Sequence, residues 1–146
     1  MPVAATGGFV IVSRVGDTKY ERIEDLTGLT VGTIRGRFYP DALALTPNIK
    51  QEVAGTLKQN ISKLLSGRID VTLEYLTDIQ ALMTDLEYKE ALQVGKEFGN
   101  SNLAFRFKDT EQGERLRIQF NHAIIELIND GSYTRIFSKT GLKTLY

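Results

Sequence analysis

Short apolar runs recur along the chain as far as residue 107, and a polar segment or a glycine separates each run from the next. Runs of this length predict buried β-strands, which we place at residues 9–13, 29–34, 49–53, 69–73, 91–94 and 103–107. Helical patterns fill most of the intervals between them. Single helices that alternate with strands are typical of βαβ units, so the pattern predicts an α/β fold with a parallel core sheet and helices on both of its faces.

The helices expected in this part of the chain are short. Pro40 is tolerated only in the first turn of a helix, which places a helix start directly after Gly36. Apolar residues at i, i+4, i+7 and i+8 predict an amphipathic helix, which Gly67 ends. The expected helices cover residues 38–45, 57–65 and 77–83.

The C-terminal quarter of the chain has a purely helical pattern. Asp109 precedes Gln112 by three residues and is predicted to cap a long helix that ends at Gly131. Ile118 and Ile125 widen its apolar stripe beyond what one contact face needs. A second, shorter helix is expected over 133–139. The stripe itself consists of Leu116, Phe120, Ile124, Leu127 and Ile128.

Composition excludes several classes of function. The chain has 146 residues, enough for one domain, and its 18 basic residues balance 18 acidic ones, so no broad basic field attracts nucleic acid or anionic lipid. There is no cysteine, which excludes disulfides and thiolate metal sites. The first eight residues lack the basic region and long apolar segment of a signal peptide.

Catalytic and cofactor motifs are absent from the sequence. The serines have no partnered base, no glycine-rich nucleotide loop is present, and His122 is the single histidine. We therefore expect no enzyme activity, no cofactor and no metal site.

Two segments predict a site for a small solute. In Leu26-Thr-Gly-Leu-Thr-Val-Gly-Thr-Ile-Arg-Gly-Arg-Phe-Tyr39, an apolar strand enters a glycine turn and a helix, and such a corner aims unpaired backbone N–H groups beyond the strand end. In Ser66-Gly-Arg-Ile-Asp70, a helix stops and another strand begins. Both strands are expected to end at one edge of the sheet, where open α/β folds bind ligands.

These segments resemble the bacterial extracellular solute-binding proteins of family 3, which deliver amino acids and similar solutes to ABC importers. The matching pieces are Asp25-Leu-Thr-Gly-Leu-Thr-Val-Gly32 with Gly36, Leu64-Leu-Ser-Gly-Arg-Ile-Asp70, Phe120-Asn-His-Ala-Ile, and Asn129-Asp-Gly-Ser-Tyr-Thr-Arg-Ile-Phe-Ser-Lys139. Their order and spacing agree along nearly the whole chain. The resemblance implies the type II periplasmic binding-protein fold, a periplasmic or extracellular location, and an ABC transporter permease as partner.

The resemblance also implies a division of the chain. Such proteins have two α/β lobes joined by two crossing strands, and residues 1–108 correspond to the second lobe with crossing strands at 9–13 and 103–107. Residues 109–146 correspond to C-terminal helices that normally pack on the first lobe. Because most of that lobe has no counterpart here, we expect the apolar stripe to be covered in a homodimer, with or without exchanged C-terminal helices, or the chain to be a truncated form.

The resemblance makes the turn at residues 35–39 the ligand loop: Gly36 permits close approach, and the N–H groups of Arg37 and Phe38 at the helix start suit an anion. Arg37 could pair with an acidic group, and Phe38 or Tyr39 could stack on a ring. At the position where amino-acid-binding relatives place an aspartate, the chain has Tyr75 with Glu74 beside it. The expected site residues are Arg35, Gly36, Arg37, Phe38, Tyr39, Glu74 and Tyr75.

Other interpretations remain open for these residues. Phe38 could fill core, and Arg35 and Arg37 could be solvated. Tyr75 could be a rim aromatic and Glu74 a surface charge; Glu74 could replace Tyr75 in the site if the strand end shifts by one residue, although alternation points it the other way. Two other functions also remain: the sensor domain of a signalling receptor, which would be extracellular, and an enzyme with Glu74 as its acid or base. We expect Arg68 and Asp70 to be structural.

Overall fold

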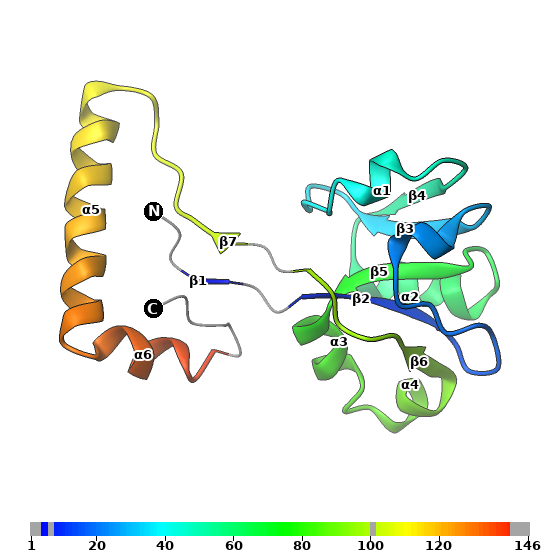
Figure 1. Cartoon of the computed structure of the whole chain (residues 1–146). Helices are drawn as coiled ribbons and strands as arrows, with labels where there is room; N and C mark the ends of the chain where they lie inside the picture. Colours follow the sequence, from blue (N-terminus) through cyan, green and yellow to red (C-terminus); the bar gives the residue numbers. More distant parts are fainter. Residues whose placement is uncertain (1–3, 6–7, 100–101, 141–146) are drawn as a thin grey trace. The chain divides into compact units, whose positions relative to one another are not determined.

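In a computed structural model of the chain, residues 4–5, 8–99 and 102–140 are described. The chain divides into two compact units, Gly8–Gly99 and Met1–Gly7 with Asn100–Tyr146 (Figure 1). The division that we expected from the resemblance follows residue 108. The functional meaning of either division stays a prediction.

The unit Gly8–Gly99 is an open five-stranded sheet in the order β4-β3-β5-β2-β6. β4, β3 and β5 run parallel, and β2 is antiparallel to both of its neighbours, β5 and β6. This confirms the expected α/β class. The strands are β2 (Phe9–Arg14), β3 (Thr30–Ile34), β4 (Lys50–Ala54), β5 (Val71–Tyr75) and β6 (Leu92–Val94).

Helices cover both faces of this sheet because its central strands bury alternate side chains on opposite sides. Phe9 and Ile11 of β2 face a core with the single turn η1 (Ile23–Leu26) and the short α1 (Ala42–Leu45). Val10 and Val12 face a second core with α2 (Leu57–Leu65), α3 (Leu76–Leu82) and α4 (Leu86–Ala91). The expected helices-on-both-faces arrangement is therefore confirmed.

Several expected boundaries were wrong. The helix expected over 38–45 is reduced to α1, and the strand expected over 69–73 begins two residues later. The strand expected over 9–13 is present as β2, inside the five-stranded sheet, and its role as a crossing strand stays a prediction. The strand expected over 103–107 is shortened to β7 (Asn102–Leu103), which pairs with β1 (Ala4–Ala5) in the other unit.

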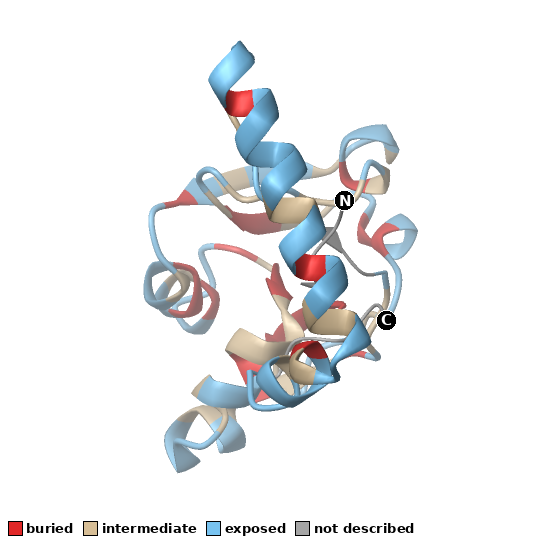
Figure 2. Ribbon diagram, turned by 90° about the vertical axis from the view of Figure 1, so that its left-hand side faces the viewer, coloured by how far each residue is buried: buried red, intermediate tan, exposed pale blue. Residues whose placement is uncertain are grey.

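The second unit contains the long helix α5 (Glu111–Asn129) and the short helix α6 (Ser132–Phe137). Thr110 caps α5, since its hydroxyl oxygen accepts the Gly113 N–H at 3.1 Å, so the expected cap at Asp109 was wrong by one residue. Much of α5 is exposed (Figure 2). No described helix has both the length and the apolar character that a membrane span requires.

Candidate functional site

The carboxyl ends of β3, β4 and β5 lie together because these strands are parallel neighbours. β3 leaves the sheet through a turn at Arg35 and Gly36, and the Arg35 N–H donates to the Ala54 carbonyl at the end of β4, 2.9 Å away. Gly36 has φ 77°, a left-handed conformation that glycine adopts without a steric penalty. This turn places residue 37 beyond the ends of all three strands.

Arg37 and Phe38 do not begin a helix, contrary to our prediction. The Arg37 N–H donates to the Ile34 carbonyl at 3.3 Å, and α1 begins only at Ala42. Proline disfavours helical geometry in the residue before it, so Pro40 keeps Tyr39 out of a helix rather than starting one. The N–H groups of Arg37 and Phe38 therefore do not lie at the start of a helix.

The side chain of Arg37 instead organises a charged cluster. Its guanidinium donates to Glu74 Oε2 at 2.7 Å and to Asp78 Oδ2 at 3.0 Å. The guanidinium carbon also lies 4.5 Å from the centroid of the Tyr75 ring, at cation–π distance. Arg37 thus reaches across the end of β5 and contacts residues on both faces of that strand.

Glu74 is completely buried, so its interpretation as a surface charge was wrong. Besides Arg37, its carboxylate accepts hydrogen bonds from the Thr72 hydroxyl at 2.7 Å and from the Asn60 amide at 3.3 Å. Burial raises the pKa of Glu74, and the bonds from Thr72 and Arg37 oppose that rise. The neighbouring Asp78 is partly exposed, at 41% of its side chain.

Aromatic side chains support the loop from the opposite face of the sheet. The Tyr39 hydroxyl oxygen accepts the Ile34 N–H at 2.7 Å, and burial raises the pKa of this phenol to about 12. The rings of Tyr39 and Tyr75 lie 6.0 Å and 5.0 Å from the ring of Phe9. Phe38 is 79% exposed, so it does not fill core.

An open hollow of about 480 Å³ lies beside this loop. It brings together four of the seven expected site residues, and Phe38, Glu74 and Tyr75 are not among those that line it. Its lining consists of Thr33, Ile34, Arg35, Gly36, Arg37, Tyr39, Gln51 and Val53.

Four polar residues near the site were missed in the sequence: Gln51, which lines the hollow, and Asn60, Thr72 and Asp78 in the charged cluster. Asn60 had a signal, because it lies at i+3 from Leu57 on the apolar stripe of α2 and therefore faces the core. Thr72 also had a signal, since it shares a strand face with Glu74.

Asp70 and Arg68 form contacts inside the protein, as we expected of structural residues. The Asp70 carboxylate accepts the Thr30 N–H at 2.7 Å, and Arg68 forms an ion pair with Glu52.

The described residues contain no group of three His, Asp or Glu side chains placed to hold a metal ion. His122 is exposed on α5.

No protein-family model matches this sequence, and no curated protein sequence matches it at a significant level. Solved structures do resemble it. An ancestral arginine-binding protein bound to arginine has a TM-score of 0.71 at 22% identity, with 94% of this chain aligned to 61% of that one. The chain has the fold of periplasmic binding proteins. It spans less than two thirds of the neighbours' length.

Two other neighbours with this fold belong to different kinds of protein. An arginine 3rd transport system periplasmic binding protein from Legionella pneumophila has a TM-score of 0.65 at 20% identity, with 94% of this chain and 62% of that chain covered. A histidine kinase sensor domain with similarity to periplasmic binding proteins has a TM-score of 0.79 at 16% identity, with 98% and 62% covered. At these identities the comparison establishes the fold, and function has to be argued from the site.

Proposed function

We propose that this chain is a non-enzymatic solute-binding component of an ABC import system, working in the periplasm or at the cell exterior. Its ligand is a small polar solute of the amino-acid type, and it binds at the carboxyl ends of β3–β5. The observation that carries the proposal is the Arg37 guanidinium, held by two carboxylates beside an open hollow at the sheet edge. The proposed site residues are Arg35, Gly36, Arg37, Phe38, Tyr39, Glu74 and Tyr75. Among them, buried Glu74 acts by holding Arg37 in place.

The charges around the site favour a solute that carries both signs. Arg35 and Arg37 supply two cations, and Asp78 supplies a partly exposed carboxylate beside the buried Glu74. A guanidinium has more N–H donors than the two bonds of Arg37 use, so its remaining donors and exposed Arg35 can bind a solute carboxylate. The partly exposed Asp78 can accept a solute ammonium.

Native mass spectrometry of the purified protein tests this proposal, because one spectrum reports retained small molecules and stoichiometry. We expect extra mass that collisional activation releases, and an amino-acid-like solute on identification. Protein that carries no solute and gains none from an amino-acid panel would contradict the proposal. Arg37→Gln is expected to weaken solute binding. Its control is Arg22→Gln, which removes an exposed arginine outside the hollow.

Solute binding serves an importer and an extracellular sensor equally well, so a second assay separates these roles. Loaded protein added to a reconstituted ABC importer is expected to stimulate ATP hydrolysis. Binding without stimulation by any tested importer would favour the sensor.

We also propose that the chain forms a homodimer through α5. Leu116, Ile118 and Ile125 on this helix are each about half exposed, at 47%, 46% and 46%. Apolar area of this kind favours association. Ile125→Glu is expected to shift the native spectrum from dimer to monomer, and a monomer in the unmodified protein would exclude the dimer.

A further inference from the structure

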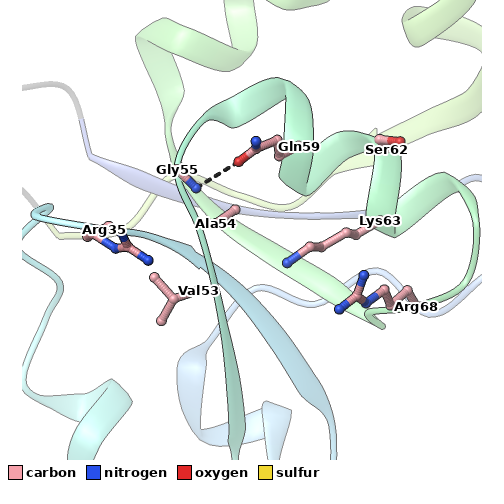
Figure 3. A pocket seen from close by; sticks show the side chains of 8 residues that line it. All are labelled: Arg35, Val53, Ala54, Gly55, Gln59, Ser62, Lys63 and Arg68. Atoms are coloured by element: carbon pink, nitrogen blue, oxygen red, sulfur yellow. Dashed lines mark hydrogen bonds between the residues drawn. The ribbon is translucent and has the colours of Figure 1, made fainter.

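A second hollow of about 480 Å³ lies along the edge strand β4, between this strand and α2 (Figure 3). It shares Arg35 and Val53 with the hollow described above. Its lining consists of Arg35, Val53, Ala54, Gly55, Gln59, Ser62, Lys63 and Arg68.

Three cationic side chains from different parts of the chain line this hollow. Arg35 follows β3, Lys63 lies on α2, and Arg68 follows that helix; Figure 3 shows them around one space. The carboxylate of Glu52 pairs with both Lys63, at 3.0 Å, and Arg68, at 2.8 Å. Arg35 forms no ion pair within the described part of the chain. Three cations against one carboxylate leave an excess of positive charge.

The contacts of Glu52 show what kind of group Lys63 and Arg68 stabilise. Its carboxylate is an oxyanion held between an ammonium and a guanidinium, and these partners lower its pKa. Neutral polar groups are also present: the exposed Ser62 hydroxyl lines the hollow, and Gln59 is held in place by accepting the Gly55 N–H at 2.8 Å. The hollow thus offers hydrogen-bond donors as well as positive charge.

We propose that this hollow binds a phosphate group, either as inorganic phosphate or on a small organic molecule, through Arg35, Lys63 and Arg68. Guanidinium groups match the geometry of phosphate oxygens with paired N–H donors, and the lysine adds a point charge. The hollow shares Arg35 with the proposed solute site, whereas Lys63 and Arg68 line only this hollow and Arg37 lines only the other. Variants of Arg68 and of the Arg37–Glu74 pair therefore distinguish phosphate binding from solute binding.

Calorimetric titration of the full chain with inorganic phosphate at low ionic strength tests the proposal. Arg35→Gln and Arg68→Gln are each expected to weaken binding about two- to fivefold, the range for exposed charge pairs. The matched control is Lys58→Gln, which removes an exposed cation from α2 outside the hollow and is expected to leave the affinity unchanged.

For a second variant we expect the phosphate affinity to change in the opposite direction. Glu52→Gln removes the internal anion that occupies Lys63 and Arg68, so it is expected to strengthen phosphate binding. Glu90→Gln, with the same charge change on the exposed face of α4, is not expected to do so. Absence of saturable phosphate binding, or equal effects of the hollow variants and their controls, would overturn the proposal.

The source of the phosphate group is resolved by a parallel titration with glycerol 3-phosphate. Tighter binding of the monoester than of inorganic phosphate supports an organic ligand, and equal binding supports free phosphate. The double variant Arg37→Gln/Glu74→Gln is expected to lose amino-acid binding and to retain phosphate binding. This difference keeps failure of the solute proposal distinct from failure of the phosphate site.

Discussion

The guanidinium of Arg37 lies 2.7 Å from Oε2 of Glu74, a carboxylate that no solvent reaches. The first residue follows the glycine turn after β3, and the second lies in β5. Their contact ties the loop to the sheet, and it places a partly buried cation beside an open hollow. Loop geometry and the stability of this unit therefore depend on the same pair.

Arg37→Ala is expected to destabilise the protein by about 3–5 kcal/mol, because it leaves Glu74 buried without its counter-ion. The double variant Arg37→Gln/Glu74→Gln removes both charges and should recover part of that loss. Urea unfolding followed by circular dichroism measures both. Arg22→Ala, at an exposed ion pair, should have little effect. A double variant no more stable than Arg37→Ala would contradict this reasoning.

The raised pKa of Glu74 gives stability a defined pH dependence. The Glu74 carboxyl holds its proton more tightly in the folded state than in the unfolded state, where its pKa is near the ordinary value of 4.5. Between these two pKa values the folded state therefore has more bound protons than the unfolded state. Stability relative to Glu74→Gln should therefore fall as pH rises from about 4.5 through the folded pKa. Unfolding curves across this range test the sign, and a rise in relative stability would contradict it.

Tyr39→Phe is expected to destabilise the protein by about 1–3 kcal/mol, since it leaves the partly buried Ile34 N–H without its acceptor. Tyr75→Phe keeps the aromatic ring and is the matched control, for which we expect a much smaller change. Thermal unfolding of both variants provides the comparison. Equal effects would show that the hydroxyl of Tyr39 contributes no specific stabilisation.

Gly36→Ala is expected to destabilise the loop by about 1–2 kcal/mol through its left-handed backbone alone, because an added Cβ meets no atom within 4 Å. Gly55→Ala changes a glycine at the end of β4 that has no positive φ. It should cost less. Hydrogen exchange of the residues after β3 reports the local loosening, which should appear in Gly36→Ala and not in Gly55→Ala.

The strands could be predicted from the sequence because their apolar runs record burial on both faces of the sheet, as in β2 and β5. The two-residue error in the start of β5 arose because Ile69 is buried before the strand begins. The position of the turn after β3 followed from Gly36. These features depend on local chemistry, so a single sequence contains them.

The charged cluster could not be predicted, because its partners are far apart in the sequence. Glu74 alternates away from Tyr75 as expected, but its burial depends on Asn60 of α2 and on Arg37 of the loop. No local pattern indicates that Arg37 folds back over the end of β5. Pro40 misled the helix prediction, since the constraint it imposes falls on the preceding residue.

The central claim is that a small polar solute binds at the ends of β3, β4 and β5. Backbone amide spectra of the isotope-labelled chain, recorded during titration with an amino-acid panel, test it most directly. We predict saturable shifts for Gly36, Arg37 and Gln51 with at least one member of the panel, and their loss in Arg37→Gln/Glu74→Gln. Spectra that stay unchanged with every member, or shifts confined to residues away from this edge of the sheet, would contradict it.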